Sequence, residues 1–422
     1  MDRLSVFLYG AHLGHLVRLK DSPSGRYDDF DFIFADTAFE SFSMGSSILS
    51  VALPLVLHQD RKKAARRRNF FHELLPEGHM LTYLANRHRI AEADTFEMLR
   101  HYGLDIAGAL EICEEGTHWL EGGSDGLSPE YKQVSDADIR SLLEKTAQFP
   151  LGNALDSGKT SLAGVQTKIL LAYDKATGWA QVRNGAASTH IIKPPVEKYP
   201  TLIYDEAFGL DLARACGLIE YFSHIETFNG LDALVIERYD RVKDTSRKRI
   251  HQEDFNQALG VAGNQKYQEY SGKVSLKRIA DTVKKFAGAE DVLELARQMI
   301  FSFLIGNLDM HAKNLSLLHL PNEDVALAPA YDLVPLQHQN TDGKMALKIG
   351  GEYYHARIGR DEIVNELLSW KLPAIKSAES AVAFVSDFSG MAEGALEQID
   401  IHPKAYPRLK DNVRKNIRLV TI

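Results

Sequence analysis

One loop sequence is the key to the architecture of this 422-residue chain: Gly306-Asn307-Leu308-Asp309-Met310-His311-Ala312-Lys313-Asn314. It follows an apolar segment that ends with Phe303-Leu304-Ile305 and has helical character. Asp309 and Asn314 stand five residues apart. A carboxylate can accept the proton of an attacking hydroxyl, and a neutral amide oxygen suits Mg²⁺. The loop therefore predicts a site that combines proton transfer with metal binding.

A second carboxylate follows eighteen residues after Asn314, in Ala330-Tyr331-Asp332-Leu333. Kinase catalytic loops hold their base and their metal-binding amide at the spacing of Asp309 and Asn314, and a later Asp links the metal to the phosphates. The set predicts phosphoryl transfer. A polar helix cap followed by a tight turn is the alternative, because strings of this kind are common.

Phosphoryl transfer also requires a cation and a loop that surrounds the phosphates. Lys193 ends the short apolar strand His190-Ile191-Ile192-Lys193, and Glu206 on the next predicted helix can orient it by an ion pair. Upstream, the segment 161–168 (Ser-Leu-Ala-Gly-Val-Gln-Thr-Lys) is a turn of small residues whose backbone N–H groups can hold phosphate. It has one glycine and matches no standard phosphate-loop motif. Taken alone, Lys193 can equally mark a strand end before two prolines.

The segment Glu237-Arg238-Tyr239-Asp240-Arg241 follows the last predicted strand of this half. A hinge that meets adenine belongs at this position, and Tyr239 offers an aromatic face. A solvated cluster of surface charges is the alternative. The motifs occur in the order that a kinase requires, namely phosphate loop, lysine, glutamate, hinge, Asp-x-x-x-x-Asn loop and metal aspartate. This order favours the kinase interpretation over each local alternative.

Composition limits the other possibilities. The chain is 45% hydrophobic and 25% charged, with a net charge of −8, so no overall basic character favours a free-standing nucleic-acid binder. Its two cysteines, Cys113 and Cys216, form no C-x-x-C pair, which argues against a zinc site and a disulfide framework. The most apolar stretch, residues 48–57, is too short to span a bilayer. We expect a cytoplasmic protein without a membrane association.

The hydrophobic pattern predicts an α+β chain. Strand and then helix patterns occupy residues 1–115, strands dominate residues 116–240, and helices dominate residues 241–422. One strand pair is predicted as a hairpin around Asn229-Gly230, and a helix is predicted over residues 252–259. The expected architecture is a two-lobed, protein-kinase-like fold with a small N-terminal α+β subdomain and a mostly helical C-terminal lobe.

At these motifs the sequence resembles the HipA family, the kinase partners of bacterial toxin–antitoxin pairs, and the resemblance covers nearly the whole chain. It rests on the segments already described and on residues 71–78 and 103–110, which resemble the family's N-terminal subdomain. Residues 252–255 and Lys266-Tyr267 also match recurrent family strings. The segment 194–205 is shorter than the activation-type loop of the best-known members and departs from the family's pattern there.

The resemblance implies a role for each matching residue. It implies that Asp309 is the catalytic base, that Asn314 and Asp332 bind Mg²⁺, and that Ser161 is an inhibitory autophosphorylation site. The implied ATP-binding residues are Ala163, Gly164, Val165, Gln166, Thr167, Lys168, Lys193, Glu237, Arg238, Tyr239, His311, Asn314, Tyr331 and Asp332.

The resemblance also implies partners. The substrate would be a protein Ser/Thr hydroxyl on an aminoacyl-tRNA synthetase or a related translation factor, and growth arrest would follow. A small HipB-like DNA-binding antitoxin would bind the chain, which would reach operator DNA only through that complex. Two other hypotheses remain: a small-molecule phosphotransferase on the same fold, and a pseudokinase that only binds.

Overall fold

The computed structural model describes residues 2–19, 30–118, 128–145, 166–242 and 248–421. The chain divides into two compact units, each built from segments that are separate in the sequence. The first contains Met1–Pro194, Glu226–Glu253 and His319–Asp324, and the second contains Pro195–Ile225, Asp254–Leu318 and Val325–Ile422. The domain boundaries expected near residues 115 and 240 stay predictions.

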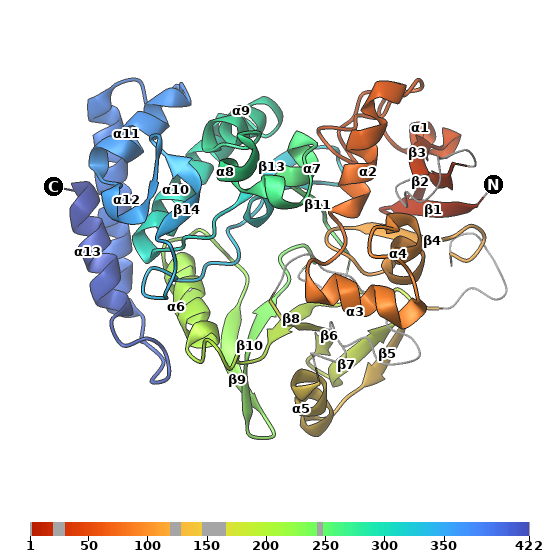
Figure 1. The fold of residues 1–422 in the computed structure, drawn as a ribbon, viewed down its shortest axis with the longest axis horizontal. Helices are drawn as coiled ribbons and strands as arrows, with labels where there is room; N and C mark the ends of the chain where they lie inside the picture. The colour runs from red at the N-terminus through yellow and green to blue at the C-terminus, as the bar shows by residue number, and fades with distance from the viewer. Residues whose placement is uncertain (1, 20–29, 119–127, 146–165, 243–247, 422) are drawn as a thin grey trace. The chain divides into compact units, whose positions relative to one another are not determined.

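The N-terminal part of the first unit is an antiparallel sheet with helices packed against it (Figure 1). The strand order is β3-β2-β1-β4. The core is mainly aliphatic and also contains several aromatic rings, of which those of Phe32 and Phe71 lie 5.1 Å apart. The elements are β1 (Arg3–Leu8), β2 (Ala11–Arg18), β3 (Phe30–Phe34), α1 (Asp36–Ser41), α2 (Ala64–His72), α3 (His79–His88), α4 (Thr95–Tyr102) and β4 (Leu110–Glu114).

A six-stranded sheet forms the rest of the first unit, in the order β5-β7-β6-β8-β10-β9. Ile139 and Leu143 of α5 pack on Ile169, Leu171 and Ile192 in its core. Asn229 and Gly230 both have positive φ, 47° and 88°, as a two-residue hairpin turn between antiparallel strands requires, so the predicted hairpin is confirmed. The elements are β5 (Glu130–Gln133), α5 (Asp136–Glu144), β6 (Ile169–Asp174), β7 (Gly178–Arg183), β8 (His190–Lys193), β9 (Ser223–Phe228) and β10 (Leu231–Glu237).

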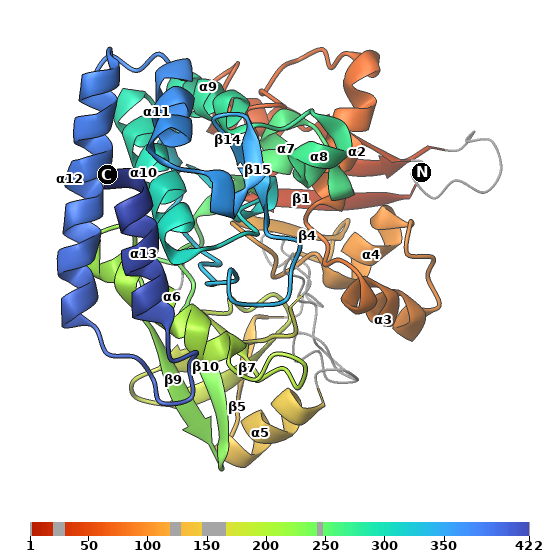
Figure 2. The ribbon, with the colours of Figure 1, turned by 60° about the vertical axis from the view of Figure 1, so that its left-hand side comes forward.

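The second unit is mostly helical (Figure 2). Its central helix is α10, whose last eight residues are all buried. Helices α9, α12 and α13 contact α10. The helices are α6 (Leu202–Ala215), α7 (Phe255–Leu259), α8 (Gln268–Ser271), α9 (Leu276–Phe286), α10 (Ala289–Ile305), α11 (Arg360–Ser369), α12 (Ala378–Gln398) and α13 (Leu409–Thr421), and the short strands are β12 (Ser316–His319), β13 (Val325–Leu327), β14 (Lys344–Ile349) and β15 (Glu352–Tyr354).

The helix predicted over residues 252–259 is wrong in its first half. Strand β11 covers His251–Asp254, and helix α7 begins only at Phe255. Asp254 caps α7: its carboxylate accepts the Gln257 N–H at 2.9 Å, and the Gln257 side chain accepts the Asp254 N–H. This capping box makes Asp254 the N-cap residue and Phe255 the first residue of the helix.

None of the helices in the described segments is both long enough and apolar enough to cross a membrane.

Candidate active site

The loop that carries Asp309 begins where α10 ends. Gly306 has φ 69° and ψ 36°, the left-handed conformation that glycine adopts without strain. Its N–H donates to Phe303 O at 3.0 Å, and the N–H of Asn307 donates to Ser302 O at 2.9 Å. These bonds satisfy carbonyls at the helix end and turn the chain sharply. The loop therefore starts at the capped end of a helix whose last eight residues are buried.

Asp309 is the one acidic residue of the loop 306–314, and 45% of its side chain is exposed. Tyr267 donates its hydroxyl to Asp309 Oδ1 at 3.1 Å. His311 Nε2 lies 3.9 Å from Asp309 Oδ2, which is an ion-pair distance rather than a hydrogen bond, and the His311 ring meets the Tyr267 ring edge-on at 5.2 Å. Tyr267 thus orients the carboxylate that the sequence singles out.

Asn314 is bonded back to the same loop. Its side-chain Nδ2 donates to Asp309 O at 2.8 Å, and its backbone N–H donates to His311 O at 2.9 Å. With the amide NH₂ group engaged in this way, the Asn314 Oδ1 oxygen is the atom suited to a cation. The structure therefore brings Asp309 and Asn314, the pair singled out by its spacing, together in one loop that also contains His311.

Asn307 links this loop to Asp332. Asn307 is 2% exposed; its Nδ2 donates to Asp332 O at 3.2 Å and its Oδ1 accepts the Asp309 N–H at 3.1 Å. Asp332 has φ 55°, a left-handed conformation that is uncommon for any residue other than glycine, asparagine or aspartate. A strained backbone held by its surroundings is frequent in functional sites. Sequence reasoning assigned no role to Asn307 or Tyr267, although both fall in motifs that it noted.

The buried hydroxyl of Tyr331 forms hydrogen bonds within the second unit. Its hydroxyl donates to Lys313 O at 2.7 Å and contacts Ser316 Oγ at 2.6 Å. Burial raises the pKa of this hydroxyl well above its ordinary value, so it stays protonated and remains a donor. Lys313 Nζ lies 3.4 Å from Asp254 Oδ2. Tyr331 thus fastens the segment before Asp332 to the end of the catalytic loop.

Helix α6 fixes the other side of the Asp332 segment. Gly209 of α6 is buried, and a Cβ atom built on it would lie 2.1 Å from Leu333 O. The backbone next to Asp332 therefore approaches α6 more closely than any side chain would permit. This contact explains why a glycine occurs in the interior of a buried helix.

The donor set fits Mg²⁺ bound together with phosphate. Within the described residues, no cluster of three or more His, Cys, Asp or Glu side chains could hold a metal ion by itself. Asn314 and Asp332 offer one amide and one carboxylate, and Mg²⁺ in nucleotide sites typically takes one or two protein oxygens plus phosphate oxygens and water. These two residues would hold the ion only with a nucleotide present.

The predicted nucleotide-binding residues lie in the first unit. Lys193 ends β8 and is 6% exposed, and Lys168, equally buried, directly precedes Ile169, whose register partner is Ile192. The two lysines therefore lie at the same end of neighbouring strands. Gln166 and Thr167 precede them at the start of this segment, whereas Ser161, Ala163, Gly164 and Val165 lie outside the described residues. The pairing of Lys193 with Glu206 stays a prediction.

The predicted hinge follows β10, where Glu237 is the register partner of His190. The Tyr239 hydroxyl donates to Gln252 Oε1. Arg238, Asp240 and Arg241 are 5%, 3% and 5% exposed, so the alternative of a solvated charge cluster is wrong. Their charges are matched inside the unit instead of by water.

This buried charge network joins the hinge to the N-terminal segment. Arg238 forms a bidentate pair with Asp240, at 2.9 and 2.7 Å, and also donates to Ile106 O at 2.9 Å. Arg241 donates to Asp105 Oδ1 at 3.0 Å, and Asp240 accepts the Gly108 N–H at 2.8 Å. Burial raises the pKa of Asp240, but Arg238 and Arg241 outweigh burial and hold it below its ordinary value. The Arg238 side chain is therefore committed to structure.

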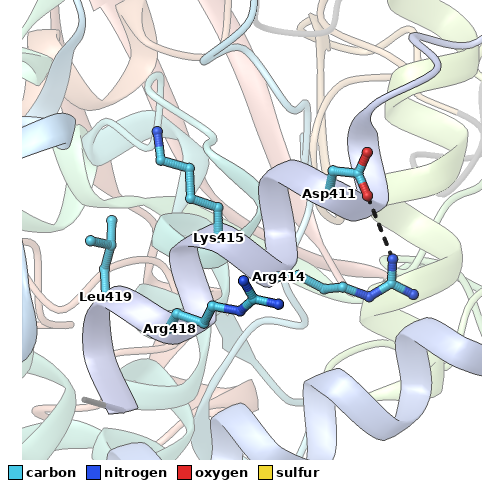
Figure 3. Close-up of a pocket in the computed structure, with 5 residues that line it drawn as sticks. All are labelled: Asp411, Arg414, Lys415, Arg418 and Leu419. Atoms are coloured by element: carbon cyan, nitrogen blue, oxygen red, sulfur yellow. Dashed lines mark ion pairs between the residues drawn. The ribbon is translucent and has the colours of Figure 1, made fainter.

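The second unit also has a pocket whose lining includes none of the residues described above. It has a volume of about 530 Å³ and is lined by Asp411, Arg414, Lys415, Arg418 and Leu419 of α13 (Figure 3). None of these was predicted as a site residue. Arg414 pairs with Asp411 at 3.6 Å and with Glu397 at 2.7 Å.

Comparison with known proteins identifies similar chains. The family model of the HipA-like C-terminal domain matches residues 160–396, and that of the HipA N-terminal domain matches residues 4–113. The protein Y4mE of Sinorhizobium fredii is 32% identical over 343 residues, which are 80% of this chain and 79% of the relative. The serine/threonine-protein kinase toxin HipA of Shewanella oneidensis is 29% identical over 304 residues, 67% of this chain and 66% of the relative.

A solved structure has the same fold. A chain in the Shewanella oneidensis MR-1 complex of HipA, HipB and operator DNA superposes with a TM-score of 0.78 at 23% identity. The match covers 99% of the present chain and 96% of that chain. The α+β, kinase-like fold expected from the sequence is therefore confirmed.

Proposed function

This chain belongs to the HipA family of kinases, and on that premise we propose that it transfers the γ-phosphoryl group of ATP to a serine or threonine hydroxyl of a protein. The observation that carries the proposal is the organisation of residues 306–314. There the half-exposed Asp309 carboxylate is oriented by Tyr267, and Asn307 ties the loop to Asp332.

In the proposed reaction, Asp309 accepts the proton of the attacking hydroxyl. The hydroxyl oxygen forms a bond to the γ-phosphorus while the bond from that phosphorus to the oxygen of ADP breaks, so ADP leaves with the charge it gains. Asn314 and Asp332 would hold Mg²⁺, which neutralises phosphate charge when bound. Tyr267 keeps the Asp309 carboxylate in one orientation, and such positioning supplies much of the rate in phosphoryl transfer.

The nucleotide would be bound by residues of the first unit. Lys193 and Lys168 supply two cations at one end of neighbouring strands, and Gln166 and Thr167 adjoin them. Glu237 and Tyr239 would meet the adenine. Ala163, Gly164 and Val165 would complete the phosphate loop, and Ser161 would be the site of inhibitory autophosphorylation.

The proposed partners follow from the family. We infer a HipB-like antitoxin, with operator DNA reached only through that complex, because a chain of the same fold occurs in such an assembly. The proposed substrate is an aminoacyl-tRNA synthetase or another translation factor.

The test is transfer of labelled phosphate from Mg²⁺-ATP to the protein itself and to purified translation factors. Asp309→Asn should lower the transfer rate about 10²–10⁴-fold, the usual effect of losing a general base. Asp387→Asn on the exposed side of α12 is the matched control and should behave as wild type. Labelling of a small metabolite without any protein would favour a small-molecule phosphotransferase. Binding of ATP without any transfer would favour a pseudokinase.

A further inference from the structure

The C-terminal helix α13 has two different faces. Its outer face carries the cations of the α13 pocket, among them the exposed Lys415 and Arg418, which are drawn in Figure 3. Its inner face carries Asn416, which is 2% exposed. The family model of the C-terminal domain ends at residue 396, so α13 lies beyond the matched segment.

Asn416 contacts the end of the helix that precedes the catalytic loop. Its Nδ2 donates to Leu304 O at 2.9 Å and to Gln337 Oε1 at 2.7 Å, with a longer contact of 3.4 Å to Phe303 O. The last carbonyls of a helix have no partner within the helix and must be satisfied from elsewhere. For α10, part of this task falls to a side chain more than a hundred residues away.

Gln337 brings the Asp332 segment to the same point. Gly306 O accepts the N–H groups of Leu336 and Gln337 at 2.8 and 3.1 Å. A Cβ atom on Gly306 would lie 2.6 Å from Gln337 Oε1, so this side chain lies directly over the turn that starts the catalytic loop. The end of α10, the start of the loop and the segment after Asp332 therefore meet at one buried amide of α13.

From these contacts we propose that Asn416 is a positioning residue for phosphoryl transfer, which fixes the relative position of the catalytic loop and the Asp332 segment through Gln337 and Leu304. The proposal rests on the proposed kinase function. Asn416 touches neither substrate nor metal; it acts through the backbone that carries Asp309 and Asp332. Asn307 joins the catalytic loop to the Asp332 segment next to Asp309 itself. Asn416 joins the same two segments through Leu304, at the end of α10, and Gln337.

The chemistry of the contact predicts which changes matter. Asn416→Asp keeps the shape but replaces the donating NH₂ by an oxygen that faces two or three acceptor oxygens. Asn416→Leu removes the donor and leaves the acceptors unsatisfied. Both changes should loosen the turn at Gly306 without altering a residue of the site.

The experiment compares steady-state phosphorylation by the full chain carrying Asn416→Asp, Asn416→Leu or Gln337→Met with two controls, Lys415→Ala and Arg418→Ala. Lys415 directly precedes Asn416 and Arg418 follows it by two residues, and both side chains are exposed on the outer face of the same helix. We expect kcat to fall about 10–100-fold in the three test variants, the scale of a displacement of about 1 Å, while KM for ATP changes less than about threefold. The controls should match wild type. Equal losses in kcat and in the fraction of folded protein would indicate a merely structural role and overturn the proposal.

A second measurement does not depend on activity. Amide hydrogen exchange should become faster at residues 304–314 in Asn416→Asp, relative to Lys415→Ala, while exchange in α12 stays unchanged. Unchanged exchange at the loop would contradict the proposal even if the protein were inactive. An inactive wild type together with faster exchange in the variant would instead refute the proposed kinase function and leave the positioning of the loop in place.

Discussion

Replacing Gly209 by alanine should slow phosphoryl transfer about a hundredfold while lowering the free energy of unfolding by only a few kcal/mol. Gly209 lies in the buried interior of α6, and the new Cβ would be 2.1 Å from Leu333 O, where ordinary contact begins at 3.4 Å. The helix and the Asp332 segment must therefore separate by about 1.3 Å. Because Leu333 directly follows Asp332, the displacement falls on the proposed metal-binding carboxylate.

Two opposing effects set the change in stability. Overpacking of a buried site costs about 1–3 kcal/mol. Alanine is favoured over glycine in a helix by up to about 1 kcal/mol. The free energy of unfolding should therefore fall by roughly 0–3 kcal/mol, which is less than the total of about 5–15 kcal/mol that is typical of a folded protein. The rate of phosphoryl transfer is far more sensitive, because a misplacement of about 1 Å can cost about a hundredfold.

The assay measures the transfer rate and thermal unfolding of Gly209→Ala beside Gly390→Ala. Gly390 lies in α12, and a Cβ there would meet nothing within 4 Å. The control should therefore be as active as wild type and up to about 1 kcal/mol more stable. A Gly209→Ala protein with wild-type activity and unchanged or raised stability would refute the reasoning.

Three other changes test separate parts of the structure. Asn307→Asp keeps the acceptor for the Asp309 N–H but loses the donor to Asp332 O, so the transfer rate, measured with labelled ATP, should fall roughly 10–10²-fold; an unchanged rate would contradict the bridging role. Asp240→Asn leaves buried Arg238 and Arg241 with Asp105 as their remaining carboxylate partner and should lower the free energy of unfolding in urea by about 3–5 kcal/mol; a loss below about 1 kcal/mol would disagree. Burial, and to a smaller extent the neighbouring His319, lowers the pKa of His251 to about 3. His251 therefore binds a proton near pH 6.5 in the unfolded state but stays neutral at that pH in the folded state. The free energy of unfolding should therefore decrease as the pH is lowered from about 6.5 to 3, by up to about 1.4 kcal/mol per pH unit. The decrease should be less steep in His251→Gln, and equal slopes in the two proteins would exclude His251 as its cause.

Local signals in the sequence predicted those parts of the fold that local chemistry determines. The Asn229-Gly230 hairpin follows from the positive φ that both turn residues require. The end of α10 follows from Gly306, and the grouping of Asp309 with Asn314 follows from a loop too short to separate them. The start of α7 was missed, although the Asp254 and Gln257 pair is itself a local signal for a helix start.

Other features depend on partners that are distant in the sequence. From the sequence alone, the charges of Arg238 and Arg241 resemble a solvated surface cluster. Their buried partner Asp105 lies more than a hundred residues earlier in the chain, and no local pattern near residue 238 predicts it. Asn416 has no local motif at all, because its role depends on the carbonyl of Leu304 and on Gln337. Tyr267 was noticed as part of a recurrent string, but its bond to Asp309 could not be inferred from the string.

The discontinuous makeup of the first unit has a consequence for how the protein is made. The hydroxyl of Tyr9 donates to the carbonyl of His319, and the carboxylate of Glu253 accepts from Ser50 Oγ and from His319 Nε2 at 2.9 Å. Ribosomes add about 5–20 residues per second, so the 310 residues between Tyr9 and His319 take roughly 15–60 s to synthesise. The first strands to leave the ribosome must therefore wait for most of the chain before their last partners arrive. A nascent chain that is stopped before residue 319 contains every strand of the N-terminal sheet but lacks His319. It should therefore be cleaved by proteases and bound by chaperones more readily than the complete chain.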